Sequence, residues 1–580
     1  MEMNMKKSIL AIGALIGSLL ISSCGKNLEV TPPNNIYDEQ IEALIAQGGD
    51  KANEIIEMFA GPMPNYFNYV GIGIGSGSAN PSTNTYQGIN WMRGLEGNDI
   101  VDGYSGTTWI DDYYGKNAYL LLKLGRLYTV AQNGAHWYGY AYGLKQANLL
   151  LKYCESLDKS SNLYKTSTAK AFLVRAFSYM SMMEEYTPAY DNMIDPTAPN
   201  SGLPIYTLSS ASQEAVARST AEETYKFILT DIQTAVDNLK AAGVGYTHED
   251  TALEDLDLGV ANYLKARCGQ NIGSKTVNGK TGWAICQEAC NEIINYGRYA
   301  FIAPENWGAT MTGDWGRSED MAFYPETNAF LSIRKAVNPE VILGYTNASS
   351  YQDSFHHALA NIYGSYASRG AIARIDDRLY NKIDDKDCRK AAFRKEEIGN
   401  IKLDGGALVY MPSYCNIKYA FTHGLSNDGA SHTTTDKNNT EFCKFRLSEV
   451  YLMLAESYAQ QNDVINTKAT LNKLLAARCN AGTVTLTCDN YASMAGMTPL
   501  QMVQLQYSIE MWGEEGREYF NNKRWKIDIN RAGSANHADA KGLNGEWSKW
   551  QEMTLEFPEN EQLYNPNYKA DEVNTPSALK

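Results

Sequence analysis

The sequence predicts a mainly α-helical protein, in which helical hairpins stack into a scaffold and a large loop-rich region packs on it. Three observations support this prediction. Apolar residues recur at helical spacing in successive segments, these segments come in pairs joined by short turns, and long stretches rich in Gly, Asn, Asp and Ser separate some of the pairs. Helix pairs that cannot bury their apolar faces alone must stack on their neighbours.

The composition is that of a folded protein with an acidic surface. Of the 580 residues, 44% are hydrophobic and 20% are charged, and the formal net charge is −15. This charge argues against a nucleic-acid partner, because phosphate binding needs a basic face. The aromatic residues are 39 Tyr and 10 Trp against only 15 Phe. Tyr and Trp can present an apolar face and a polar tip at a wet surface, which suits the binding of polar, partly apolar ligands such as sugars.

The N-terminus has the features of a lipoprotein export signal. Met5-Lys6-Lys7 is basic, and the apolar run Ile9–Ile21 is too short to span a bilayer. The run ends in Ile21-Ser22-Ser23-Cys24, which resembles the lipobox of bacterial lipoproteins. We therefore predict a signal peptide over residues 1–23, a lipidated tether over 24–35 that begins at Cys24, and a single domain over 36–580.

The helices are predicted from their apolar stripes. Tyr225, Ile228 and Ile232 belong to a stripe that runs to Leu239, and Ser219-Thr220 before Glu222-Glu223 predicts a capped, acidic first turn. Equivalent patterns predict helices over residues 39–58, 140–154, 167–185, 220–240, 257–271, 283–296 and 499–514. The segments 140–154 and 167–185 together predict an αα-hairpin.

A second hairpin is predicted near the C-terminus. One stripe runs from Leu447 to Tyr458, the next includes Leu471 and Leu475, and the turn between them lies at residues 461–463. Ala455 and Leu471 stand at a spacing that suits a degenerate tetratricopeptide repeat of ~34 residues.

The loop-rich region, about residues 76–115 and 300–440, is the predicted ligand-binding part. Long irregular segments in a compact protein are usually functional or disordered, and their Trp residues favour order. A sugar site needs exposed rings for stacking beside polar side chains that bind the hydroxyls. Trp109 and Trp315 are the leading candidates for ligand contact, and the remaining candidates are Trp91, Arg93, Asn98, Asp99, Tyr113, Trp307 and Tyr324.

The cysteines and histidines indicate neither a metal centre nor a catalytic site. Cys24 aside, nine cysteines remain, and an odd number in an exported protein excludes a systematic disulfide framework. Cys286 and Cys290 share a helix face and are interpreted as buried small apolar residues, whereas Cys479 and Cys488 flank a turn and could bridge. The sequence contains no nucleophile elbow, zinc-protease or phosphate-loop motif. We predict no cofactor, no metal and no enzymatic activity.

After the lipobox, a series of motifs runs through nearly the whole chain: residues 142–148, 171–186 with Arg175-Ala176-Phe177-Ser178-Tyr179, 202–205, 219–239, 340–342, 446–456, 514–520 and 523–528. In the order and spacing of these motifs, the chain resembles the SusD/RagB family of Bacteroidetes outer-membrane lipoproteins. The chain departs from the family at residues 186–190, which lack the usual glycine after the helix.

The resemblance implies a tetratricopeptide-like scaffold whose loop-rich region carries a glycan site. It also implies an outer-membrane, surface-exposed location and a SusC-like TonB-dependent transporter as the partner that receives the oligosaccharide. Arg524 and Trp525 lie in a family motif and are expected to be structural, as is Trp283 at a helix start. The alternatives are peptide or glycopeptide binding, a protein-interaction scaffold, and a glycoside hydrolase with two converging carboxylates.

Overall fold

The computed structural model describes most of the chain after the first 37 residues. The described ranges are 38–67, 93–94, 96–101, 131–207, 215–247, 255–308, 311–312, 322–323, 327–345, 373–402, 408–411, 413–419, 441–538 and 546–580. The chain divides into a unit of residues 1–52 and a unit of residues 53–580. The predicted single domain over 36–580 stays a prediction. The signal peptide, Cys24 and the tether lie outside the described residues.

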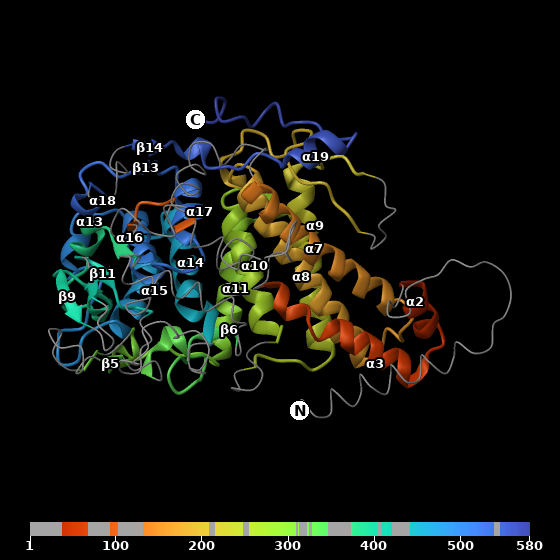
Figure 1. Ribbon diagram of the computed structural model, residues 1–580, viewed down its shortest axis with the longest axis horizontal. Coiled ribbons are helices and arrows are strands. Elements are labelled where there is room, and N and C mark those ends of the chain that lie inside the picture. The colour runs from red at the N-terminus through yellow and green to blue at the C-terminus, as the bar shows by residue number, and fades with distance from the viewer. Residues whose placement is uncertain are drawn as a thin grey trace. The chain divides into compact units, whose positions relative to one another are not determined.

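The fold is mainly α-helical, as predicted (Figure 1). The described helices are α2 (Asp38–Ala46), α3 (Gly49–Ala60), α7 (Ala131–Cys154), α8 (Asn162–Tyr186), α9 (Ala221–Ala241), α10 (Leu258–Ile272), α11 (Gly282–Tyr296), α13 (Asp377–Tyr380), α14 (Leu447–Gln460), α15 (Val464–Ala477), α16 (Pro499–Glu510), α17 (Arg517–Trp525), α18 (Ala535–Ala538) and α19 (Glu559–Tyr564).

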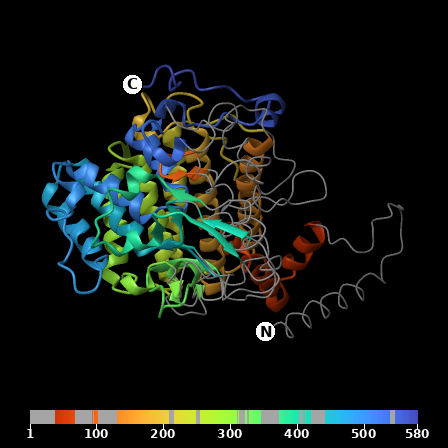
Figure 2. The same ribbon diagram turned by 60° about the vertical axis from the view of Figure 1, so that its left-hand side comes forward.

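The predicted helical hairpins are present. Helix α8 packs between α7 and α9, α10 packs on α11, and α14 packs on α15. Figure 2 shows the blue C-terminal helices beside the green pair α10 and α11, and α11 contacts α14. Helices α8, α9 and α10 bury side chains against their neighbours, as a stacked helical-repeat scaffold requires, whereas α19 has no buried residue. The turn at residues 461–463 separates α14 from α15, as predicted.

The start of α9 follows the sequence prediction closely. The Thr220 hydroxyl accepts a hydrogen bond from the Glu223 amide at 3.1 Å, and the Glu223 carboxylate accepts one from the Thr220 amide at 2.9 Å. This reciprocal capping box satisfies two backbone donors that a helix N-terminus otherwise leaves without partners. The predicted stripe of apolar residues on α9, from Tyr225 to Leu239, is buried.

Four predicted helices differ clearly in extent from those observed. Helices α7 and α8 begin earlier than predicted, at Ala131 and Asn162. The prediction of one helix over 39–58 was wrong, because α2 ends at Ala46 and α3 begins at Gly49. Gly48 between them has a φ of +68°, a left-handed conformation that ends a right-handed helix. The helix predicted over 499–514 ends at Glu510, and Gly513 shortly after it has a φ of +73°.

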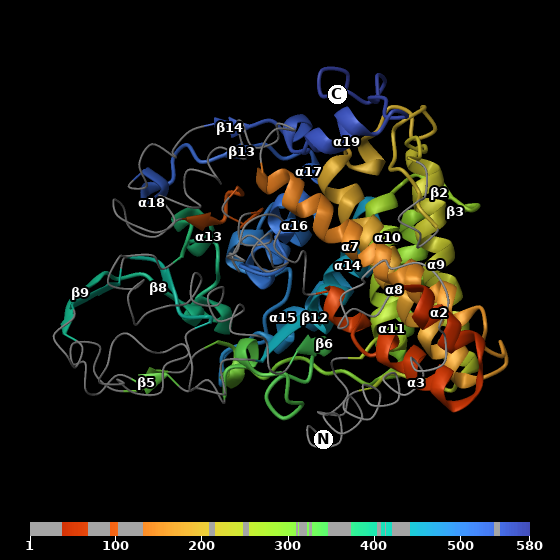
Figure 3. The same cartoon turned by 45° about the vertical axis from the view of Figure 1, so that its right-hand side comes forward.

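The described strands are short and form small antiparallel sheets. Their bounds are β1 (Ile100–Val101), β2 (Thr276–Val277), β3 (Lys280–Thr281), β4 (Met311–Thr312), β5 (Ala322–Phe323), β6 (Val341–Tyr345), β7 (Arg374–Ile375), β8 (Phe393–Arg394), β9 (Ile398–Lys402), β10 (Leu408–Met411), β11 (Cys415–Asn416), β12 (Phe442–Arg446), β13 (Ile529–Asn530) and β14 (Glu546–Ser548). The largest sheet has the order β1-β7-β11-β8, and Ile100 pairs with Ile375. This pairing brings the segment before β1 next to α13 (Figure 3).

The cysteines in the described residues are free thiols. The bridge considered between Cys479 and Cys488 does not form, and the Cys479 sulfur instead accepts a hydrogen bond from the Leu486 amide at 2.9 Å. Cys286 and Cys290 are buried with their sulfurs 3.9 Å apart, which agrees with their interpretation as small interior residues. Among the described helices, none is long and apolar enough to cross a membrane.

Candidate ligand-binding site

A pocket of about 460 Å³ lies where four segments of the chain meet. Its walls combine amide, carboxylate, cationic and apolar side chains with one indole. They come from the loop before β1, from α13, from α16 with the turn before it, and from α17 with the segment after it: Asn98, Asp99, Asp376, Arg378, Leu379, Lys382, Met497, Gln501, Gln504, Leu505, Ser508, Glu518, Asn522, Trp525, Ile527, Asp528 and Asn530.

Helical spacing explains how α16 and α17 present their side chains to the pocket. On α17, Glu518, Asn522 and Trp525 follow one another at four and three residues and therefore share one face. On α16, Gln501 and Gln504 stand three residues apart, and Ser508 follows four residues later on the same face. A polar face on an otherwise buried helix is the sequence signal that could have identified these residues.

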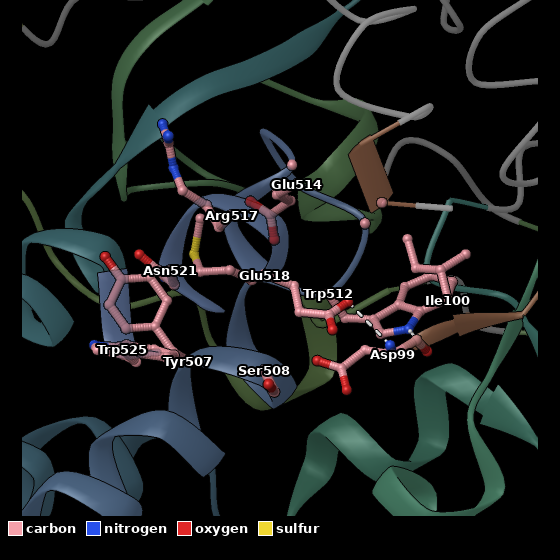
Figure 4. Close-up of a pocket in the computed structure, with 14 residues that line it drawn as sticks. Asp99, Ile100, Tyr507, Ser508, Trp512, Glu514, Arg517, Glu518, Asn521 and Trp525 are labelled. Atoms are coloured by element: carbon pink, nitrogen blue, oxygen red, sulfur yellow. Dashed lines mark hydrogen bonds between the residues drawn. The ribbon is translucent and has the colours of Figure 1, made fainter. Parts of the chain in front are cut away.

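The loop before β1 is fastened to α17 through one carboxylate. Glu518 accepts hydrogen bonds from the Asn98 amide, from the Asp99 amide at 2.9 Å and from the Asn522 side chain at 3.0 Å. The approach is so close that a Cβ on Gly97 would overlap the Glu518 carboxylate, so a larger residue there would require that carboxylate to move. The Trp512 indole also donates to the Asp99 carbonyl at 3.0 Å (Figure 4).

Trp525 is held in place by a hydrogen bond to a buried carboxylate. Its indole N–H donates to Oε1 of Glu456 on α14 at 2.7 Å, and the Arg524 guanidinium donates to both oxygens of the same carboxylate. Glu456 is fully buried. The expectation that Arg524 and Trp525 are structural agrees with these contacts and with the packing of the Trp525 ring on Tyr507, whose ring centroids lie 5.8 Å apart, but Trp525 also lines the pocket. Trp283, the other expected structural Trp, is buried at the start of α11.

Two of the four acidic residues that line the pocket have a cationic partner. The Arg378 guanidinium bonds both oxygens of Asp376 at 2.7–3.1 Å, and Lys549 bonds Asp528 at 2.8 Å. Within the described part of the chain, Asp99 and Glu518 form no ion pair, and Oδ2 of Asp99 is buried without a hydrogen-bond partner.

The environment raises the pKa of both of these carboxyl groups. For Asp99, burial and the negative charge of Asp376 raise the pKa to about 6, although a hydrogen bond from Ser508 lowers it. For Glu518, burial and the neighbouring Asp99 carboxylate raise the pKa well above its ordinary value, against the lowering effect of the Asn98 and Asp99 amides. Both effects follow from placing charge in a poorly solvated site.

A second, smaller cavity of about 20 Å³ adjoins the same residues. Figure 4 shows Asp99, Ser508, Glu518 and Trp525 in its lining, and all four also line the larger pocket. A cavity of this size holds about one water molecule. The two cavities therefore share a wall in which the unpaired carboxylates stand.

The structure describes four of the predicted ligand-binding residues. Asn98 and Asp99 line the pocket. Arg93 is buried and forms ion pairs with Glu96 and Glu185, and Trp307 is buried with the Arg478 guanidinium 4.4 Å from its ring centroid. These interior places do not support the ligand contact predicted for Arg93 and Trp307. The other five predicted residues lie outside the described residues: Trp91, Trp109, Tyr113, Trp315 and Tyr324.

The pocket holds residues that the sequence analysis did not select, above all Arg378, Gln501, Gln504 and Trp525. The indicated ligand chemistry is polar, with hydrogen-bonding groups and a face that can lie against an indole. Among the described residues, no group of three or more His, Cys, Asp or Glu is arranged to hold a metal ion.

The fold and the pocket define a helical-repeat protein with a polar candidate binding site. A model of the SusD family matches residues 322–577, and a second model, described as "Starch-binding associating with outer membrane", matches residues 77–246. The chain belongs to the SusD family. None of the curated proteins matches it.

Solved structures share the fold at low sequence identity. A SusD-like carbohydrate binding protein from Bacteroides vulgatus is 16% identical, with a TM-score of 0.60 over 90% of this chain and 98% of that chain. A SusD superfamily protein from Bacteroides thetaiotaomicron is 17% identical, with a TM-score of 0.61 over 90% and 99%. Surface glycan-binding protein A from Bacteroides thetaiotaomicron is 15% identical, with a TM-score of 0.57 over 88% and 96%.

Proposed function

We propose that this protein captures a glycan at the cell surface without cleaving it and delivers it to a SusC-like TonB-dependent transporter in the outer membrane. The observation that carries the glycan-binding part is the pocket itself, in which the Trp525 indole stands among amide and carboxylate side chains. Sugars bind to such sites through C–H burial on a ring and hydrogen bonds from their hydroxyls.

The amides supply the hydrogen-bonding capacity that a polyhydroxylated ligand needs. Gln504 carries both a donor and an acceptor at the pocket wall. Gln501 and Asn530 offer their NH2 donors there, since their carbonyl oxygens accept from the Thr498 and Ala532 amides. Leu379, Leu505 and Ile527 provide apolar surface beside them. Trp109 and Trp315 belong to the loop-rich region and lie outside the described residues. We further propose that they add stacking contacts to the same ligand.

The location at the outer membrane is supported by two features. The family model that matches residues 77–246 describes proteins that associate with the outer membrane. The Cys24 lipobox supplies the anchor in this proposal, since two or more acyl chains bind a membrane stably where one does not. Transfer to a SusC-like transporter is the role that the resemblance to the SusD/RagB family implies, and we include it in the proposal on that ground.

Affinity electrophoresis of the purified full chain against a panel of neutral, amino and acidic polysaccharides tests the proposal. We expect one class of glycan to retard the protein, with no release of reducing ends. Trp525→Ala, Trp109→Ala and Trp315→Ala are each expected to weaken the retardation. Tyr564→Ala is the matched control, because Tyr564 is 77% exposed on α19 and contributes no side chain to the pocket.

The outcomes separate the alternatives. Retardation that all three Trp substitutions leave unchanged would place the glycan elsewhere on the protein. No retardation by any polysaccharide, together with binding of peptides, would replace glycans by protein-derived ligands. Release of reducing ends would show a glycoside hydrolase and contradict the proposal.

A further inference from the structure

Among the acidic groups that line the pocket, those of Asp99 and Glu518 have no cationic partner in the described part of the chain. The Asp376 and Asp528 carboxylates have their cations in Arg378 and Lys549. Glu518 receives hydrogen bonds only from neutral groups, the two loop amides and Asn522. The Asp99 carboxyl receives one from the neutral Ser508 hydroxyl, and its Oδ2 has none. A buried carboxylate oxygen without a donor is costly, so this position favours a ligand that brings its own donor.

The cationic side chains nearest to these two carboxylates either donate hydrogen bonds to backbone carbonyls or are exposed to solvent. Arg378 also donates to the Asn530 and Ala532 carbonyls at 3.2 and 3.0 Å, and Arg531 donates to the Gly97 carbonyl at 2.7 Å. Lys382 is exposed. Arg378 and Lys382 lower the pKa of Asp99, and Arg531 lowers that of Glu518, yet both pKa values remain raised. A compact cation at the shared wall would complete the charge balance there.

We propose that this pocket binds a saccharide carrying a protonated amine, whose ammonium group lies against the Asp99 and Glu518 carboxylates. This inference rests on the proposed glycan-binding function. The ammonium supplies three donors for oxygens that the protein leaves underused, and the ring lies on Trp525 with its hydroxyls toward Gln501 and Gln504. An acidic sugar would bring a second anion to the Asp99 carboxylate, so this wall disfavours it.

The cation requirement gives the affinity a defined pH dependence. In the free protein the Asp99 carboxyl, with a pKa of about 6, is charged at pH 7 and mostly protonated at pH 5. A protonated carboxyl offers the ammonium no charge, so the affinity falls as the pH is lowered from 7 to 5. A neutral sugar that binds by hydrogen bonds to the amides has no such dependence.

Titration calorimetry of the full chain with D-glucosamine, D-glucose and N-acetyl-D-glucosamine tests the inference, since these sugars differ only at one substituent. At pH 7 we expect glucosamine to bind on the order of fivefold more tightly than the other two. Asp99→Asn is expected to remove this preference and its pH dependence. Asp237→Asn, the same charge change on the exposed face of α9, is the control and keeps the preference.

Three results would overturn the inference. They are equal or weaker binding of glucosamine than of glucose, no detectable binding of glucosamine, and a preference that Asp99→Asn leaves intact. If the tripeptide Gly-Lys-Gly binds as tightly as glucosamine, the site recognises the ammonium charge without the sugar, and the ligand class would be basic peptides, which also contradicts the inference. The polysaccharide panel keeps the two proposals apart: a glycan-binding protein without an amine preference contradicts only this one, whereas a protein that binds no glycan contradicts both.

Discussion

The Arg175 guanidinium clasps the Asp231 carboxylate with two parallel hydrogen bonds, Nε to Oδ2 at 2.7 Å and Nη2 to Oδ1 at 2.8 Å. A third bond runs from Nη1 to Oδ1 of Asn148 at 2.8 Å. One buried side chain of α8 thus binds both neighbouring helices, α7 and α9. The Asp231 carboxylate neutralises its charge and Asn148 accepts a further hydrogen bond, which is the condition under which a buried arginine is tolerated.

We predict that Arg175→Ala lowers the free energy of unfolding by about 3–5 kcal/mol, because it leaves the buried Asp231 without its cation. Urea unfolding followed by circular dichroism measures the loss. The control is Lys226→Ala, which removes the exposed i,i+4 pair between Lys226 and Glu222 on α9 and should cost less than about 0.5 kcal/mol. Equal effects of the two substitutions would contradict the structural role of Arg175.

The helices could be predicted because their signals are local. A stripe such as Tyr225 to Leu239 repeats within one segment, and the capping pair Thr220 and Glu223 lies three residues apart. The break between α2 and α3 was missed because Gly48 ends the helix without interrupting the spacing of the apolar residues. Local patterns therefore predict which segments are helical more surely than where each helix ends.

The pocket could not be predicted because its residues meet only in the folded chain. Asp99 and Glu518 are separated by about four hundred positions, and no local sequence pattern in either segment indicates that the two residues meet. Trp525 was expected to be structural, and its bond to Glu456 supports that, but one indole can serve packing with its N–H and a pocket with its ring. Arg93 has the residue type of a binding site, yet its partner Glu185 places it in the interior.

A second stability prediction concerns Glu510, on which three arginines converge. Its carboxylate accepts from Arg446 at 2.7 Å, from Arg478 at 2.8 Å and from Arg389 at 3.0 Å. Burial acts to raise the pKa of Glu510, but the three guanidinium charges outweigh it and hold the pKa well below its ordinary value. Glu510→Gln should lower the free energy of unfolding by about 3–5 kcal/mol, because buried arginines lose their shared anion.

The measurement for Glu510→Gln is the unfolding midpoint in guanidinium chloride, which also screens surface charges. Glu288→Gln removes an exposed carboxylate that pairs with Lys280 and should change the free energy of unfolding by less than about 0.5 kcal/mol. A Glu510→Gln protein as stable as the Glu288→Gln control would show that the network contributes no net stability.

The acid sensitivity of the fold should depend on His537. Burial and the charge of Arg531 lower its pKa to about 2, so the folded protein keeps the imidazole neutral where the unfolded chain, with an ordinary histidine pKa, takes up a proton. Its contribution is fully present above pH 6.5 and is lost as the pH falls from there toward 2, at up to about 1.4 kcal/mol per pH unit.

The test compares wild type with His537→Gln at pH 7 and pH 5. We expect the free energy of unfolding of the wild type to fall by about 2 kcal/mol more than that of the variant over this interval. The comparison cancels the contributions of other groups, including Asp99, whose raised pKa has the opposite sign. Parallel pH profiles for the two proteins would show that His537 takes up its proton in the folded state.

The last prediction concerns the contact between Gly97 and Glu518. An alanine Cβ at position 97 would meet Oε2 of Glu518 at 2.1 Å, which is closer than atoms can approach. The carboxylate would have to leave the Asn98 and Asp99 amides, so Gly97→Ala should lower the free energy of unfolding by about 1–3 kcal/mol and weaken ligand binding. In a Glu518→Ala background the obstacle is absent, and adding Gly97→Ala should cost less than about 0.5 kcal/mol. A double-mutant cycle measures this difference, and additive effects would show that Gly97 is required for its backbone and not for the carboxylate beside it.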